Sequence, residues 1–262
     1  MNELTKRFLS AIILASLVIA GIIYLPVYVV KVFIAIITVL CVYEIFNLLN
    51  KRLVGIYKKE VLAVGFLSSL SLMFLSFYLA LLIIVVYSFY EAVKKYDLNY
   101  LSYIIFGFFY GVFFPSSLGL IVDIDKNLLF VLFAVVWTGD TAAYFVGKLF
   151  GRVKLAPVLS PKKTVEGAVG SFIGSVLAGY FAVRYFGFES YWMVAVIVSA
   201  VLLQVGDLFE SFIKRQVGSK DSSNLIPGHG GLLDRIDSLI FASVVFLAVY
   251  SIVNQLKTFT ML

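Results

Sequence analysis

Charge is scarce in this chain of 262 residues: Asp, Glu, Lys and Arg make up 14% of it, while hydrophobic residues make up 62%. The mean hydropathy is +1.03. An ordinary soluble domain contains about 25% charged residues, so this composition is typical of an integral membrane protein. Cysteine and histidine are each present once. Because Cys41 is alone in an apolar segment, a disulfide framework and a cysteine metal cluster are both excluded.

Long apolar runs fill most of the chain. A helix needs about 20 apolar residues to cross a hydrocarbon core of about 30 Å. The runs predict an all-α, polytopic membrane bundle, with Pro26 separating the first two spans and Phe77-Tyr78 dividing the third from the fourth. The first run is interpreted as a span rather than a cleavable signal, because no small-residue cleavage site leads into a soluble domain. About nine transmembrane helices are expected, near residues 8–25, 27–49, 61–77, 79–93, 101–121, 128–147, 166–186, 191–212 and 236–253.

The loops between these runs are too short to hold a separate domain, and no low-complexity segment or internal repeat interrupts the pattern. Residues 1–262 are therefore expected to form a single membrane domain. Within it, residues 1–127 supply N-terminal transmembrane helices and residues 128–262 a catalytic transmembrane region.

Lysine and arginine are unevenly divided between the two ends of the predicted bundle. Cytoplasmic loops of membrane proteins are enriched in these residues. With a cytoplasmic N-terminus, only Lys31, Lys126, Arg184 and Lys257 fall on the far side, which leaves 17 of the 21 Lys and Arg residues facing the cytoplasm. The count predicts a multi-pass protein of the cytoplasmic membrane. It also explains the net charge of +6 without nucleic acid, for which no basic module interleaved with aromatics is present.

The two longest polar connections, residues 148–165 and 213–235, fall on the cytoplasmic side in this topology. Because they share a side, we expect them to build one active site that faces the cytoplasm.

Acidic residues occur at unusual depth in two of the predicted spans. Asp140 lies well inside the sixth span, and Asp207 lies near the cytoplasmic end of the eighth. A charge in lipid costs several kcal/mol unless it is paired, hydrated or coordinated. Asp234 and Asp237 are three residues apart and so share a helix face. Carboxylates without soft ligands suit Mg²⁺, although pairing of Asp140 or Asp207 with a lysine, or a helix-capping role, is the alternative.

A glycine-rich turn, residues 227–231, leads into the ninth span. Glycines allow close backbone approach, and the exposed amides at a helix start attract phosphate. Lys220 and Arg235 are placed to neutralise phosphate charge, whereas Lys214 and Arg215 fit the positive-inside bias equally well. His229 suits a hydrogen-bond donor, a proton carrier or a structural imidazole.

The segment 160–167 reads as a helix start, with Ser160 at the cap and Pro161 in the first turn. Lys162 and Lys163 then oppose the helix dipole, which an anion would relieve; a basic loop that obeys the topology is the alternative. Farther along, four glycines are expected to serve close helix packing, namely Gly167, Gly170, Gly174 and Gly179.

The charged and glycine positions of residues 137–237 resemble the phosphatidate cytidylyltransferase family, also called CDP-diglyceride synthases. The likeness is weak over residues 1–130. Its signature runs through Ser211-x-x-Lys214-Arg215, Lys220-Asp221 and Pro227-x-His229-Gly230-Gly231-x-x-Asp234-Arg235-x-Asp237. Two more runs are similar to other motifs of the family, Ser160-Pro161-Lys162-Lys163-Thr164-x-Glu166-Gly167 and Trp137-x-x-Asp140 through Gly147.

The resemblance implies a Mg²⁺-dependent transfer of CMP from CTP to phosphatidic acid, which gives CDP-diacylglycerol and pyrophosphate for phospholipid synthesis. A homodimer in the lipid bilayer and a possible second cation are also expected. The implied catalytic residues are Asp207, Asp234, Lys220, Asp221 and Arg235. The implied substrate-binding residues are Ser160, Lys162, Lys163, Thr164, Lys214, Asn224, His229, Gly230 and Gly231. The implied metal ligands are Asp207 and Asp234, with Asp140 and Asp237 for a further cation or for support of the first.

Three other readings stay open at this point. A CDP-archaeol synthase or a CTP-dependent polyprenol kinase would share much of the cytidine chemistry. A cation transporter would explain acids inside the membrane, but not a glycine-rich helix start and lysine pairs on one membrane face. A noncatalytic lipid-binding scaffold would leave the acids unexplained.

Overall fold

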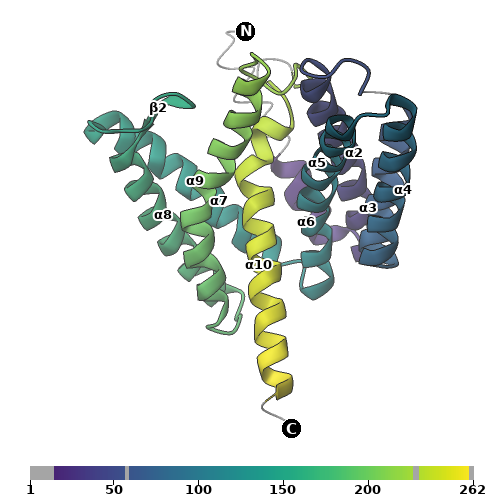
Figure 1. Ribbon diagram of the computed structural model, residues 1–262. Helices are drawn as coiled ribbons and strands as arrows, with labels where there is room; N and C mark the ends of the chain where they lie inside the picture. The colour runs from purple at the N-terminus through teal and green to yellow at the C-terminus, as the bar shows by residue number, and fades with distance from the viewer. Residues whose placement is uncertain (1–14, 57–58, 227–229, 260–262) are drawn as a thin grey trace. The chain divides into compact units, whose positions relative to one another are not determined.

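The computed structural model describes residues 15–56, 59–226 and 230–259, and these residues are almost entirely helical (Figure 1). The chain is divided into two compact units. The first comprises Met1–Lys126 together with Asp221–Asp234, and the second comprises Asn127–Lys220 together with Arg235–Leu262. The segment 221–234 therefore belongs with the N-terminal helices, although it follows the predicted eighth span in the chain.

The first unit is built from five helical stretches. A helix over Ala15–Tyr24 is followed by α2 (Val27–Asn50), α3 (Lys59–Phe74) and α4 (Phe77–Lys95). The last stretch is continuous from Leu98 to Ile124 and consists of α5 (Leu98–Phe108), the π-helical turn η1 (Phe109–Phe113) and α6 (Phe114–Ile124). Pro115 is the second residue of α6, where its missing N–H leaves one hydrogen bond to the preceding turn unmade.

Helix α2 packs closely on this last stretch through two glycines. A side chain at Gly107 would meet the ring of Phe46 at 2.8 Å, and one at Gly111 would meet Ile45 at 2.9 Å. Small residues at these positions let the helix backbones approach each other. The core of the first unit therefore lies around the inner face of α2, which carries the buried Glu44 as well as apolar residues.

The second unit contains α7 (Leu128–Phe150), a hairpin of β1 (Lys154–Ala156) and β2 (Ser160–Thr164), α8 (Val165–Tyr185) and α9 (Trp192–Gln216). Helix α10 (Leu233–Phe259) belongs to this unit from Arg235 onward. Helices α7, α8 and α9 lie side by side (Figure 1).

The four glycines of α8 serve packing, as predicted. A side chain at Gly170 would meet Val146 at 2.6 Å, and one at Gly174 would meet Ala142 at 2.8 Å. Gly167 lies against the backbone of α7 at Ala143, and Gly179 lies against Val135 of α7 and Val196 of α9. Close contact along α8 follows from their lack of side chains.

Seven helices among the described residues are long and apolar enough to cross a membrane: α2, α4, the stretch Leu98–Ile124, α7, α8, α9 and α10. The all-α membrane bundle expected from the sequence is thereby confirmed. Each predicted span coincides with a helical stretch where the structure describes it; residues 8–14 of the first span lie outside the described residues. Helix α3 has 16 residues, or about 24 Å at the usual rise, which is shorter than the hydrocarbon core. The exact number of crossings and the side of the N-terminus stay predictions.

Three local boundaries differ from the sequence expectation. Helix α4 begins at Phe77 because the Ser76 hydroxyl accepts a hydrogen bond from the Tyr78 amide, so the break before it falls at residues 75–76. Helix α10 begins at Leu233 rather than near residue 236. The third difference is the hairpin, in which β1 and β2 pair in antiparallel fashion where a helix start was expected.

The helix start predicted at Ser160 and Pro161 is wrong, because both residues lie in β2 and α8 begins only at Val165. The true cap is Thr164, whose backbone is extended and whose hydroxyl accepts the Gly167 amide at 3.1 Å. Lys162 and Lys163 therefore precede the helix, and the expected conflict with its dipole is absent.

Candidate active site

Strand β2 and helix α9 bring a lysine and an aspartate together in the second unit. The Lys163 ammonium lies 2.7 Å from Asp207 Oδ2 and donates to the Gln204 side-chain oxygen at 3.2 Å. Gln204 in turn donates to the Ser171 hydroxyl at 3.1 Å. Successive side chains of a strand point to opposite faces. Lys162 therefore points away from Asp207 and Gln204, and its side chain is exposed.

Two further aspartates belong to the same cluster. The carboxylates of Asp140 in α7 and Asp237 in α10 each interact electrostatically with that of Asp207, and Asp140 also interacts with Lys163. Asp237 Oδ1 accepts the Ser238 amide at 2.7 Å. Three helices thus contribute three carboxylates and β2 one ammonium, which we call the acidic cluster: Asp140, Lys163, Asp207 and Asp237.

The acidic cluster has the chemistry of a site for a hard cation, with three carboxylates; the Lys163 ammonium pairs with Asp207, and the Lys214 ammonium interacts with Asp237 from outside the cluster. Within the described ranges, no three or more His, Cys, Asp or Glu side chains converge to hold a metal ion. Mg²⁺ does not require such a cage, because it keeps several waters and is usually held by one or two carboxylates together with substrate phosphates. The residues present therefore fit this ion.

In the first unit, Asp234 holds in place residues 221–226 and 230–234 of the family signature, which we call the signature segment. Its Oδ2 accepts the Gly231 amide at 2.8 Å and the Ser222 amide at 2.9 Å. The Leu232 and Leu233 amides donate to Glu44 of α2, at 2.8 and 2.7 Å. The expectation that these helix-start amides are open to phosphate is therefore wrong, because two carboxylates already accept their hydrogens.

Asp207 and Asp234 belong to different units, and a metal ion shared by them stays a prediction. So does one site formed by loops 148–165 and 213–235. His229 lies outside the described residues, and its assignment to substrate binding likewise stays a prediction.

Lys214 is buried, and its ammonium lies 2.8 Å from Glu210 Oε2 one turn earlier in α9. Its neighbour Arg215 is exposed and donates to the Ser219 carbonyl at 2.7 Å, which closes the end of the helix. A buried ion pair favours a structural part for Lys214. The other predicted residues of this region have exposed side chains, namely Lys220, Asp221, Asn224 and Arg235.

The predicted site residues of the hairpin differ in burial. Thr164 is buried as the cap of α8, while Ser160 is half-buried and pairs with Ala156. Glu166 accepts the Arg152 amide at 3.0 Å, which ties the chain leaving α7 to the start of α8. These contacts hold the strand from which Lys163 projects.

Two residues that contact the predicted site residues were missed by sequence reasoning. Gln204 had no charge to mark it, although its spacing of three from Asp207 on one helix places both on the same face. Glu44 lies in α2, outside the signature, where a single acid in an apolar span is the available signal.

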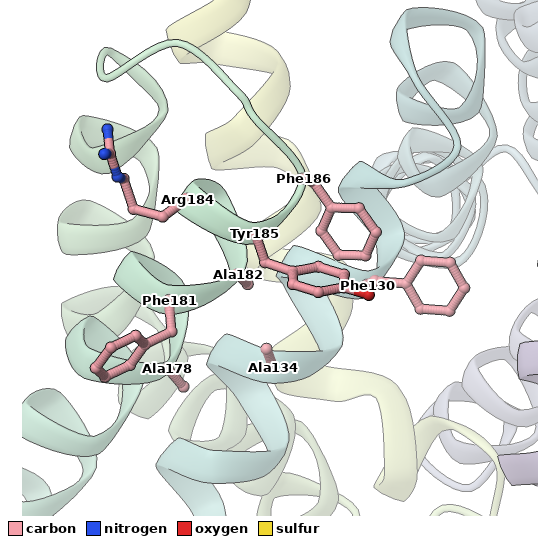
Figure 2. Close-up of a pocket in the computed structure, with 8 residues that line it drawn as sticks. All are labelled: Phe130, Ala134, Ala178, Phe181, Ala182, Arg184, Tyr185 and Phe186. Carbon is pink, nitrogen blue, oxygen red and sulfur yellow. The ribbon is translucent and has the colours of Figure 1, made fainter.

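An open, largely apolar pocket of about 790 Å³ lies between α7 and α8 (Figure 2). Ala134 of its lining is six residues from Asp140, or about 9 Å along α7, and its α8 residues fall in the last turns of that helix. The Arg184 side chain points away from the aromatic rings. The pocket is thus separate from the acidic cluster; it is lined by Phe130, Ala134, Ala178, Phe181, Ala182, Arg184, Tyr185 and Phe186.

Sequence comparison identifies the family of this chain. The model of the cytidylyltransferase family matches residues 5–253, nearly the whole chain. The chain belongs to this family. The match favours the enzymatic interpretation over the cation transporter and the noncatalytic scaffold, because it includes the acidic cluster and the signature segment.

Several relatives of this chain are named phosphatidate cytidylyltransferase. The protein of Brucella suis biovar 1 (strain 1330) is 43% identical over 142 residues, which are 52% of this chain and 53% of the relative. That of Aquifex aeolicus (strain VF5) is 41% identical over 162 residues, 61% of each chain. That of Staphylococcus saprophyticus is 45% identical over 122 residues, 45% of this chain and 47% of the relative. The matches thus span about half to three fifths of these relatives.

Proposed function

We propose that this cytidylyltransferase converts CTP and phosphatidic acid into CDP-diacylglycerol and pyrophosphate. An oxygen of the lipid phosphate attacks the α-phosphorus of CTP, and the bond from that phosphorus to the oxygen bridging to the β-phosphorus breaks. The nucleophile is already an anion, so a strong general base is not required. Family membership and the names of the relatives support this substrate pair.

The observation that carries the proposal is the contact between Lys163 and Asp207 at 2.7 Å within a membrane domain. A half-buried ammonium gains more from a phosphate than an exposed one, because charge attraction is stronger away from bulk water. Gln204 orients Lys163 from the side. Lys163 is thus placed to bind a phosphate oxygen of CTP or of the lipid once that phosphate competes with Asp207.

We further propose Mg²⁺ as the cofactor, held by Asp207 with Asp140 or Asp237. When bound, the ion would neutralise charge on the transferred and leaving phosphates. The residues of this chain have the remaining task of holding the two substrates in line, which accelerates transfer by fixing the reacting atoms near each other. A second cation and the homodimer stay predictions.

The proposed active site faces the cytoplasm, where CTP is present. The support is the concentration of lysine and arginine in the connections assigned to the cytoplasm, including Lys148 in the last turn of α7 and Arg152 and Lys154 between α7 and α8.

The test is product formation by purified protein in detergent with phosphatidic acid and Mg²⁺. CTP labelled at the α-phosphorus should pass its label to the lipid, and CTP labelled at the γ-phosphorus should release its label in pyrophosphate. Transfer of the γ-label to an added polyprenol would instead show a kinase. A lipid product from an ether-linked phosphatidate analogue alone would point to the archaeal-type lipid.

A further inference from the structure

Glu44 is a buried acid in the middle of the contacts that shape the signature segment. Its side chain lies in α2 and has no exposed surface, with the residue 0% exposed. Its carboxylate accepts four hydrogen bonds, all from the segment 221–234 or the start of α10. Oε1 accepts from the Ser223 hydroxyl at 2.5 Å and the Leu232 amide at 2.8 Å, and Oε2 accepts from the Ser222 hydroxyl at 3.0 Å and the Leu233 amide at 2.7 Å.

These bonds explain why a carboxylate is stable at this position. Burying a charge costs several kcal/mol unless it is fully hydrogen-bonded, and here each oxygen has one hydroxyl and one amide donor. Two of the donors are amides at the start of α10, which have no acceptor within the helix. The helix dipole also favours a negative charge at this end. Glu44 therefore caps α10 from a different helix, which accounts for the start of α10 at Leu233.

Glu44 is linked to Asp234 through one hydroxyl. Ser222 Oγ lies 3.0 Å from Glu44 Oε2 and 3.0 Å from Asp234 Oδ2. A hydroxyl has a single hydrogen to donate, so the two carboxylates share it. The position of the Asp234 side chain therefore depends on how firmly Glu44 holds Ser222.

The need for a glycine at position 231 is explained by the same two side chains, Glu44 and Ser222. A side chain there would meet Glu44 Oε1 at 2.7 Å and would also collide with the Ser222 hydroxyl. Gly231 thus lets the backbone approach the buried carboxylate, a task for which only glycine has room. The signature glycine and the acid in α2 form one packing unit.

We propose that Glu44 is a positioning residue for nucleotidyl transfer: it fixes residues 222–223 and 231–234, including the Asp234 carboxylate, without touching substrate. The proposal rests on the proposed function, since it concerns the same reaction. It assigns to the N-terminal helices a part in catalysis, which the signature alone places in the C-terminal half.

The decisive variant is Glu44→Gln, which keeps the shape of the side chain but replaces one acceptor oxygen with an NH₂ donor. That donor would face a hydroxyl and an amide, so residues 222–223 and 231–234 should be held less firmly. We expect kcat to fall at least tenfold while the KM for CTP changes less than threefold. Glu44→Asp keeps the charge on a shorter side chain and should recover part of the lost kcat.

The matched control is Glu91→Gln. Glu91 is also a buried acid of the first unit, but its ion pair is with Lys94 within α4. Both glutamine variants should lower thermal stability, and only Glu44→Gln should lower kcat at a temperature where both are folded. Hydrogen exchange should also show faster exchange at the Leu232 and Leu233 amides in Glu44→Gln alone.

The two failures are distinguishable. Wild-type protein that makes no CDP-diacylglycerol would refute the proposed function. Active wild-type protein in which Glu44→Gln and Glu91→Gln have equal kcat would overturn the positioning role. If Glu44→Gln does not fold, Ser223→Ala decides: this milder variant removes one donor to Glu44 and should lower kcat twofold to fivefold, and an unchanged kcat would overturn the proposal.

Discussion

Asp207 is the residue on which the proposed chemistry depends most, because it pairs with Lys163 and interacts with two other aspartates. Replacing it by asparagine removes its charge with little change of shape. We expect Asp207→Asn to lower kcat/KM by about 100-fold or more, the scale seen when one charge-stabilising group is lost. The rate of CDP-diacylglycerol formation in detergent measures this.

The control for this variant is Glu189→Gln, which removes an exposed carboxylate paired with Lys257. It should leave the rate unchanged. An Asp207→Asn protein that is folded and fully active with Mg²⁺ would remove Asp207 from the site.

The two lysines of β2 should differ, although the sequence gives them the same part. Lys163 contacts Asp207 and Gln204, whereas Lys162 is exposed. Lys163→Ala should lower kcat/KM at least tenfold, or about 1.4 kcal/mol, and Lys162→Ala should lower it less. Steady-state kinetics in CTP and in phosphatidic acid will show which substrate is affected. Equal losses of kcat/KM in both variants would contradict this difference and would indicate that the two lysines share one electrostatic role.

At the scale of the helix, the seam between α7 and α8 should tolerate no added side chain. In Gly170→Leu the new atoms would meet Val146, whose nearest side-chain atom is 2.6 Å from the position of an added Cβ. Overpacking of this kind costs about 1–3 kcal/mol. We expect a lower midpoint in a thermal unfolding curve of the detergent-solubilised protein. Val169→Leu changes the exposed neighbour and should leave the midpoint unchanged.

The helical elements could be predicted from sequence because their signal is long and uniform. In a membrane, apolar runs of about 20 residues are expected to form helices, and the described part of every predicted span coincides with a helix. The hairpin could not be predicted this way: Ser160-Pro161 is also a helix-start pattern, and only pairing with residues 154–156 favours the strand.

The sequence predicted which residues form the candidate site better than it predicted their contacts. Asp140, Asp207 and Asp237 stand out as acids in apolar helices, and the structure brings them into electrostatic contact with one another. The glycine turn before α10 was predicted to offer amides to phosphate, but the Gly231 amide donates to Asp234. The next two amides, of Leu232 and Leu233, donate to Glu44, which lies 189 residues before Leu233 in the chain. A contact over such a separation leaves no local pattern to detect.

At the scale of the whole molecule, the first unit includes a part of the signature. The segment Asp221–Asp234 belongs to the same compact unit as the N-terminal helices, while Asp237, three residues on, belongs to the second. The weak sequence likeness over residues 1–130 therefore does not mark that region as a mere anchor. Its side chains shape the residues that the family signature contains.

The orientation of the molecule can be tested with the two ends of α8. The hairpin residue Val158 is 87% exposed, and Ser190 is exposed in the connection that follows α8. Helix α8 has 21 residues and is long enough to cross the membrane once. The two positions should therefore face opposite compartments, with residue 158 in the cytoplasm.

Single cysteines at these positions, in a Cys41→Ala background, should report this with an impermeant thiol reagent. In intact cells we expect Ser190→Cys to react and Val158→Cys to be protected, and in inverted vesicles the reverse. Cys41 is fully buried, so its replacement removes a weak background rather than a labelled site. Labelling of Val158→Cys from outside intact cells would place Lys163 beyond the reach of cytoplasmic CTP, and the proposed function would fail together with the topology.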